Sequence, residues 1–249
     1  MKKSRLFLFI LLVFSTAQLI GQKKWDFDIG LGASLNSGNV NNCNINHNLG
    51  LNRNDSLIAF DFHYKLLYSS IINKYETGRK WEETNFEING GVKLDYKQYG
   101  RFSPFLACEF FTNKYKGYVY KVSGLVGLKY RIYTIPSVCD YSISAAFVDD
   151  HSVYTDETVL PTNNYRISIR PKIKQKISDN LYLVHFTFYQ PSVLDFKDYL
   201  IDSETKLQTQ ITKMLHLDLS FIYEYRSRVP SENYKKHDIH TEVTFRLKI

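Results

Sequence analysis

Residues 239–249, I-H-T-E-V-T-F-R-L-K-I, are the last stretch of the sequence and decide its fold class. Apolar residues hold one parity and polar residues the other, which is typical of a β-strand with one apolar and one polar face. The apolar set is Ile239, Val243, Phe245, Leu247 and Ile249; the polar set is His240, Glu242, Thr244, Arg246 and Lys248. An unpaired apolar edge strand invites aggregation. We therefore expect this strand to be paired on both sides.

A strand near the other end of the sequence fits as its partner. In residues 25–36, Trp25, Phe27, Ile29 and Leu31 alternate with Asp26, Asp28 and glycines. When the first and last strands of a sheet pair, the sheet closes and has no edge. The sequence therefore predicts an all-β fold: an antiparallel, up-and-down transmembrane β-barrel with a polar lumen.

Twelve stretches have the length and alternation of such strands. A tilted strand needs about 9–11 residues to cross a bilayer, and nearly all of the stretches reach that length. Short turns alternate with longer connections, as in bacterial outer-membrane barrels, which have even strand numbers. The expected strands are residues 25–36, 43–52, 57–69, 84–97, 105–112, 118–133, 139–148, 165–177, 181–190, 199–212, 217–227 and 239–249.

The first 21 residues are typical of a secretory signal peptide. Lys2, Lys3 and Arg5 precede an unbroken apolar run of nine residues, Leu6–Phe14, and small residues follow. Nine apolar residues are too few for a membrane-spanning helix, which needs about 20. We expect residues 1–21 to be a signal peptide, residues 22–249 to form the barrel, and both barrel termini to face the periplasm.

Bulk composition excludes several other classes of protein. The net charge of +7 includes three cations of the predicted signal peptide, and no clustered Lys/Arg motif indicates nucleic-acid binding. Mean hydropathy is −0.30, but alternating strands average polar and apolar residues, so hydropathy does not argue against a barrel. Cys43, Cys108 and Cys139 are too few and too widely spaced for a disulfide framework or a metal motif.

Several short motifs resemble one family. Residues 32–51, G-A-S-L-N-S-G-N-V-N-N-C-N-I-N-H-N-L-G-L, are similar to the opening hairpin of the salt-induced outer-membrane protein family, with its S-G-N turn and polar second strand. Residues 86–93, the strand at 120–130 and a last loop with Pro230 also resemble it. The resemblance implies an outer-membrane barrel of undefined biochemical role, without catalytic or cofactor residues. Ile249 departs from the aromatic residue that usually ends such barrels.

The most suggestive chemical feature is a row of basic residues in the stretch 165–177. Arg166, Arg170, Lys172, Lys174 and Lys176 share one parity, opposite a row of isoleucines, so we expect all five to face the lumen. Rings of basic residues favour anions in pores. Alternatively, these cations pair with acids of other strands and fill or narrow the lumen, which we favour. The expected partners are Asp61, Glu87, Asp95, Asp218, Glu224 and Glu242.

The leading function from the sequence is a structural or envelope-stress (salt)-related role; the alternatives are a small anion-preferring diffusion channel and, less favoured, a lipid-modifying enzyme. The enzyme would need His151 and Ser152 to meet on the outward face, whereas they lie in an expected polar loop, 149–163. The histidines, including His237 and His240 beside Asp238, do not nominate a metal site. We expect no enzymatic activity and no cofactor.

The expected partners follow from the location. They are outer-membrane lipid and lipopolysaccharide, and the barrel-assembly machinery, which would engage the C-terminal strand Ile239–Ile249. We expect a monomer that binds no nucleic acid.

Overall fold

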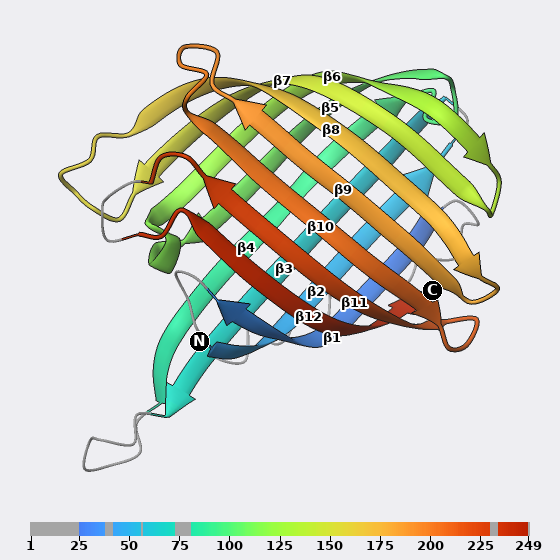
Figure 1. Ribbon diagram of the computed structural model, residues 1–249, viewed down its shortest axis with the longest axis horizontal. Helices are drawn as coiled ribbons and strands as arrows, with labels where there is room; N and C mark the ends of the chain where they lie inside the picture. Colours follow the sequence, from blue (N-terminus) through green and yellow to red (C-terminus); the bar gives the residue numbers. More distant parts are fainter. Residues whose placement is uncertain (1–24, 38–41, 56, 73–80, 230–233, 249) are drawn as a thin grey trace, which may run out of the picture.

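The computed structural model describes residues 25–37, 42–55, 57–72, 81–229 and 234–248. The predicted signal peptide lies outside these residues. Twelve strands form one closed antiparallel barrel, as the alternation predicts (Figure 1). They are β1 (Trp25–Ser37), β2 (Asn42–Asn54), β3 (Ile58–Ile72), β4 (Trp81–Tyr96), β5 (Phe102–Asn113), β6 (Tyr118–Ile135), β7 (Cys139–Tyr154), β8 (Thr162–Ser178), β9 (Leu181–Pro191), β10 (Tyr199–Gln210), β11 (Leu215–Arg226) and β12 (His237–Lys248).

Closure occurs between the two strands that the sequence nominates. β12 pairs with β11 on one side and with β1 on the other, so that Leu31 lies opposite Phe245 and Ala33 opposite Val243. Both edges of the last strand are therefore hydrogen-bonded, and the barrel has no free edge for aggregation.

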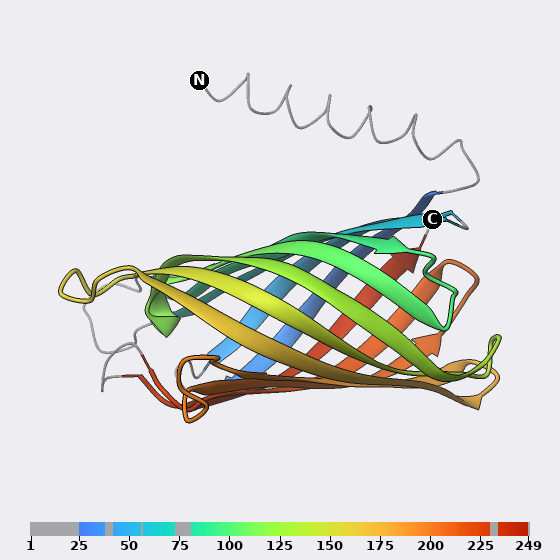
Figure 2. The ribbon, with the colours of Figure 1, turned by 90° about the horizontal axis from the view of Figure 1, so that it is seen from above.

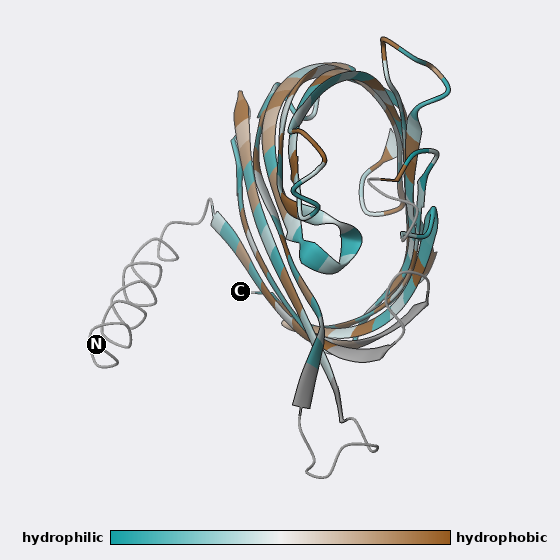
Figure 3. Ribbon diagram, turned by 90° about the vertical axis from the view of Figure 1, so that its left-hand side faces the viewer, coloured by the Kyte–Doolittle hydropathy of each residue, from teal (hydrophilic) through white to brown (hydrophobic). Residues whose placement is uncertain are grey.

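Side-chain burial follows the predicted parities. In β12, Val243 and Phe245 are 41% and 54% exposed on the outer surface, whereas Glu242 and Thr244 between them are buried. The buried side chains of the described residues are mostly polar or charged, which is the reverse of a soluble protein. An apolar outside and a polar inside match a barrel surrounded by lipid. Figure 3, drawn along the barrel, shows this alternation around the ring.

The barrel has two different ends. Trp25, at the start of β1, lies near Arg53, and Lys248, at the end of β12, pairs with Asp28, so both described termini share one end (Figure 2). The connections at this end are short, such as the turn between Ser178 and Leu181. We call it the terminal end and the other the loop end. Among the described residues no helix is long and apolar enough to cross a membrane.

Two connections at the loop end differ from expectation. β7 continues to Tyr154 and β8 begins at Thr162, so residues predicted as loop, including His151 and Ser152, belong to a strand hairpin. The main-chain pairing of Ser152 with Thr162 extends the ladder beyond the apolar region. Between β5 and β6, the short helical turn η1 (Lys114–Lys116) lies inside the ring of strands (Figure 3).

Candidate functional site

The lumen is the candidate functional site, and part of the basic row of β8 lines it. Outward neighbours such as Ile167 and Ile169 are about 40% exposed, and Arg166, Arg170 and Lys172 line internal cavities. The row divides into residues with a carboxylate partner and residues without one.

Arg166 is fully engaged near the loop end. Its guanidinium lies 3.0 Å from the carboxylate of Asp198 and 3.4 Å from that of Asp150, and it donates to the carbonyl oxygen of Gln190 at 3.1 Å. The residue is only 6% exposed. This network ties the β9–β10 connection to the wall, so Arg166 is a structural cation. At the opposite end, Lys176 pairs with Asp179 in the next turn at 3.0 Å.

The three residues between them have no carboxylate within 4 Å in the described part of the chain. Arg170 donates its Nε to the Ser168 hydroxyl at 2.7 Å and lies over the ring of Phe188 at 4.6 Å. Lys174 lies over the ring of Tyr182 at 5.2 Å. The side chain of Lys172 makes no hydrogen bond or ion pair within the described residues and is exposed to the lumen.

The predicted pairing of the basic row with six acids of other strands is wrong, because each acid pairs with another residue. Glu242 pairs with Lys65 at 2.5 Å, Asp218 with Arg246 at 3.0 Å, and Asp95 with Lys93 at 2.8 Å. Glu87 and Glu224 both bind Lys116, and Asp61 lies 3.5 Å from His63. Each acid takes its partner from its own strand, from a strand other than β8 or from the inserted turn.

Ion pairs cross the lumen on the side away from β8. Lys65 of β3 reaches Glu242 of β12, and Lys116 of η1 bridges Glu87 of β4 and Glu224 of β11. These strands are not neighbours in the sheet. The contacts therefore span the interior and narrow it, but the cations are Lys65 and Lys116 rather than the expected basic row.

Three cavities remain along the other side of the lumen. A cavity of about 390 Å³ lies in the terminal half, one of about 220 Å³ in the middle, and one of about 400 Å³ at the loop end. The first two share Glu109, Arg170 and Phe188, and the last two share Lys121. The cavities therefore adjoin one another from end to end, and Arg170 stands where the first two meet.

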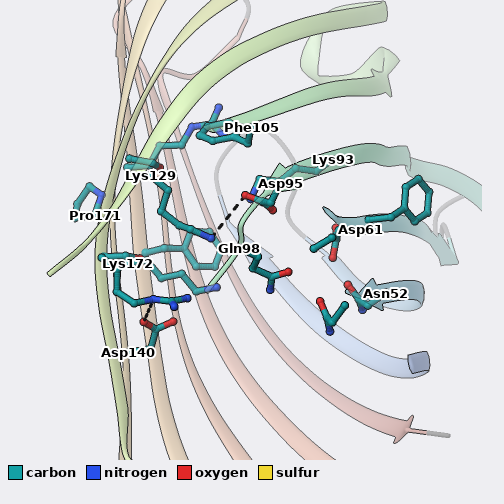
Figure 4. A pocket seen from close by; sticks show the side chains of 18 of the residues that line it. Asn52, Asp61, Lys93, Asp95, Gln98, Phe105, Lys129, Asp140, Pro171 and Lys172 are labelled. Carbon is teal, nitrogen blue, oxygen red and sulfur yellow. Dashed lines mark ion pairs between the residues drawn. The ribbon is translucent and has the colours of Figure 1, made fainter. Parts of the chain in front are cut away.

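The terminal-half cavity is charged and polar (Figure 4). Asp95 accepts from Lys93 and faces Lys129 at 3.6 Å, and Asp140 lies 3.1 Å from Arg131. Lys172 projects into the same space from β8. The lining also contains amides and hydroxyls, from Asn52, Asn54, Gln98, Ser142 and Ser144, and apolar side chains, from Ala59, Phe60, Phe105, Pro171, Phe186 and Phe188.

The His151–Ser152 pair does not meet. His151 lies on the outward parity of β7, where its Nδ1 is 2.7 Å from Asn163 Oδ1, whereas Ser152 is buried and lines the loop-end cavity. Adjacent residues of a strand point to opposite faces, so the barrel wall separates them. This arrangement removes the basis for a lipid-modifying enzyme at that position.

A polar cluster on the lipid-facing surface was not predicted. His185 Nδ1 is 2.9 Å from Thr205 Oγ1, His185 Nε2 is 3.2 Å from Thr187 Oγ1, and Thr187 is 3.1 Å from Ser203 Oγ. His185 shares the outward parity of its neighbour Ile173. The cluster lies mid-strand, whereas lipid ester bonds lie at the membrane interface, so its depth does not suit lipid hydrolysis. The alternation of residues 181–189 places His185 and Thr187 on the same face of the strand, so the sequence already contained the pattern that predicts this cluster.

One group of potential metal ligands occurs among the described residues. Oxygen and nitrogen atoms of Glu224, Asp238 and His240 lie within 4.8 Å of one another. However, the ammonium group of Lys116 is 2.7 Å from Glu224. A cation is therefore already in contact with this group, and its charge would repel a metal ion.

Comparison with solved structures identifies the same architecture in outer-membrane channels. The NanC porin structure matches with a TM-score of 0.58 and 9% identity, over 89% of this chain and 100% of that chain. The KdgM porin in complex with disordered oligogalacturonate matches with a TM-score of 0.50 and 10% identity, over 88% and 98% of the two chains. At these identities the likeness shows the fold alone: an outer-membrane β-barrel.

Sequence comparison gives the family. No curated protein matches the chain. Residues 29–248, nearly the whole barrel, match the model of a family described as "Protein of unknown function, DUF481". The resemblance in the hairpin and strand motifs is thereby confirmed, and the chain belongs to the DUF481 family of proteins of unknown function.

Proposed function

We propose that this protein is an outer-membrane channel that conducts small polar solutes and prefers anions. In this proposal residues 1–21 direct export, and the terminal end of the barrel faces the periplasm. The observation that carries it is the line of three adjoining cavities beside a wall with three cations that have no carboxylate partner within 4 Å.

The cavities support passage rather than a filled interior. A twelve-stranded barrel lies between small barrels, which side chains fill, and 16-stranded porins, which hold an aqueous channel. Here the cross-lumen ion pairs occupy one side, and water-sized space follows the other. A solute would meet a narrow, polar path, so we expect a small conductance.

Electrostatic repulsion supports the preference for anions. Lys174 is close enough to Arg246 and Lys248 for the three cations to repel one another, and Lys172 likewise interacts with Lys93 and Lys174. Arg246 and Lys93 are compensated by Asp218 and Asp95, but Lys172 and Lys174 have no carboxylate partner of their own, and their uncompensated charge raises the free energy of the lumen. A passing anion relieves that repulsion, whereas a cation increases it.

The likeness to porins also supports the proposal. Two of the solved structures with this fold are porins, and one of them is described in complex with disordered oligogalacturonate. A barrel of this fold is thus compatible with a channel.

Planar-bilayer recording tests the proposal. The refolded protein should give small, steady single-channel currents whose reversal potential in a KCl gradient indicates anion preference. The double variant Lys172→Glu, Lys174→Glu should move the reversal potential toward cations. Lys213→Glu, which reverses an exposed turn cation at the same end, should leave it unchanged. Unaltered selectivity in the double variant would refute the role of the basic wall.

A structural role is the second candidate, and the bridge made by Lys116 favours it. This residue is 3% exposed and holds β4 and β11 together across the lumen. A protein that inserts and shows heat-modifiable migration but never conducts would support this role over the channel.

A further inference from the structure

The terminal-half cavity contains a ledge with the properties of a ligand subsite. We define the ledge as Arg170 and Lys172 of β8 with Phe186 and Phe188 of β9, all of which line the cavity. Lys172 lies opposite Phe186 in the β8–β9 ladder, so cations and rings stand side by side.

Arg170 is held in a fixed orientation. Its Nε donates to Ser168, which is fully buried, and its guanidinium carbon Cζ lies 4.6 Å from the centre of the Phe188 ring. The terminal nitrogens make no hydrogen bond within the described residues. A guanidinium fixed in this way presents two parallel N–H groups, which match the two oxygens of a carboxylate.

Lys172 supplies a second, unengaged positive charge. It is two residues from Arg170 on the same face, roughly 7 Å along the strand. Two acids, Asp140 and Asp61, interact with it from beyond 4 Å. Asp140 already contacts Arg131, and Asp61 already contacts His63. A ligand anion on Arg170 would therefore also be attracted by Lys172.

The aromatic residues define the remainder of the ligand. Phe186 and Phe188 are stacked on each other, with ring centres 5.2 Å apart and planes at 27°. They offer an apolar surface directly beside the two cations of the ledge, in a cavity whose lining also includes Phe60 and Phe105. An inorganic anion gains nothing from such a surface, whereas the C–H face of a ring packs against it.

From these features we propose that the ledge binds small organic acids in which a carboxylate is attached to a hydroxylated ring, that is, sugar acids. The carboxylate lies against Arg170 and Lys172, and the ring against the phenylalanines. The hydroxyls point toward Asn52 and Gln98, which line the same cavity, and toward Ser142, which lies beside Lys172 on the neighbouring strand β7. The cavity of about 390 Å³ has room for one such ring. This inference rests on the proposed channel only for its physiological use, because binding can be measured without conduction.

Titration calorimetry on the refolded protein in detergent tests the ledge directly, with glucuronate, glucose and inorganic phosphate as ligands. We expect glucuronate to bind, glucose to bind at least tenfold more weakly, and phosphate to bind more weakly than glucuronate. Arg170→Gln and Phe188→Leu should each weaken glucuronate binding about tenfold, since each removes one half of the recognition. Lys176→Gln, on the same face of β8 but already paired with Asp179, should leave it unchanged.

The outcomes separate the ledge from the channel. Glucuronate binding without bilayer current would uphold the ledge and refute the channel. Current without glucuronate binding, or equal binding of phosphate and glucuronate, would refute the ledge while leaving the channel intact. If Arg170→Gln does not refold, as judged by heat-modifiable migration, Lys172→Gln replaces it: unchanged affinity in that variant refutes the proposal.

Discussion

The ammonium nitrogen of Lys116 lies 2.7 Å from the carboxylate of Glu224 and thereby connects the inserted turn to the opposite wall of the barrel. The same nitrogen is 3.2 Å from Glu87, and Asn113 donates to Glu87 at 2.9 Å. The turn is therefore fixed to β4 and β11 together, which no main-chain hydrogen bond joins.

Replacing Lys116 with Met should destabilise the barrel strongly. Two carboxylates would face each other across the lumen without their cation, and breaking a buried ion pair costs about 3–5 kcal/mol. Urea-induced unfolding in lipid vesicles measures the loss. Lys114→Met is the matched control, because Lys114 is an exposed residue of the same turn and solvent screens its pair with Glu83, so its loss should have little effect on stability. Equal losses in the two variants would contradict the bridge.

The bridge should persist over the ordinary pH range. Burial by itself would lower the pKa of Lys116, but the carboxylates of Glu224 and Glu87 outweigh it and raise the pKa above its ordinary value. A raised folded-state pKa contributes stability that is complete below the unfolded-state pKa and is lost as pH rises through the folded-state pKa. The stability difference between wild type and Lys116→Met should therefore be constant from about pH 6 to pH 9 and shrink only above about pH 10.5. A difference that shrinks below pH 9 would show that other groups govern the contact.

Two members of the basic row should respond in opposite ways to neutralisation. Arg166→Gln leaves Asp150 and Asp198 without their shared cation and should lower the free energy of unfolding by about 3 kcal/mol. Lys172→Gln breaks no ion pair and relieves repulsion from Lys93 and Lys174, so stability should change by less than about 0.5 kcal/mol. Anion preference should fall in Lys172→Gln and change little in Arg166→Gln. Unfolding curves and reversal potentials together check both halves.

The fold was predictable because it depends on local periodicity. Alternation fixes which side chains of β1, β8 and β12 face lipid. Closure of the barrel follows because an exposed apolar edge strand would promote aggregation, so the first and last strands pair with each other. Strand ends were less accurate: β7 runs to Tyr154 because main-chain pairing continues where the apolar alternation stops.

The site was predictable only in part. The parity of Arg166 to Lys176 places them on the lumen wall, but their partners depend on which strands face each other across the barrel, and alternation carries no such information. Glu224 meets Lys116 because a helical turn, expected only as a loop, folds inward. Asp198 meets Arg166 because the β9–β10 connection bends over the wall.

Two glycines of β6 provide a test of internal packing. A Cβ added at Gly127 would lie 2.5 Å from Phe105 Cζ and 2.6 Å from the carbonyl oxygen of Ala145, whereas a Cβ at Gly124 would meet nothing within 4 Å. Gly127→Ala should therefore cost about 1–3 kcal/mol as Phe105 and the β7 backbone shift. Gly124→Ala, three residues away, should cost nothing measurable. Similar unfolding midpoints for the two variants would show that Phe105 can move freely in the lumen.

The lipid-facing cluster around His185 tests which side of β9 meets the bilayer. Its imidazole bonds to Thr205 and Thr187, so the neutral ring is satisfied without water. A permanent cation there has no such option, and Arg at the bilayer midplane costs about 2–4 kcal/mol on a lipid-facing position. His185→Arg should therefore lower the free energy of unfolding in vesicles by that amount, whereas His185→Leu should change it by less than about 1 kcal/mol, since lipid solvates leucine well.

Gln208→Lys on neighbouring β10 is the control, because its parity faces the lumen, where water solvates the new charge. A large loss of stability in Gln208→Lys together with none in His185→Arg would show that the assigned faces of β9 and β10 are reversed and that the ledge lies outside the lumen. A penalty confined to His185→Arg places Phe186 and Phe188, on the opposite parity of the same strand, inside the barrel where the ledge requires them.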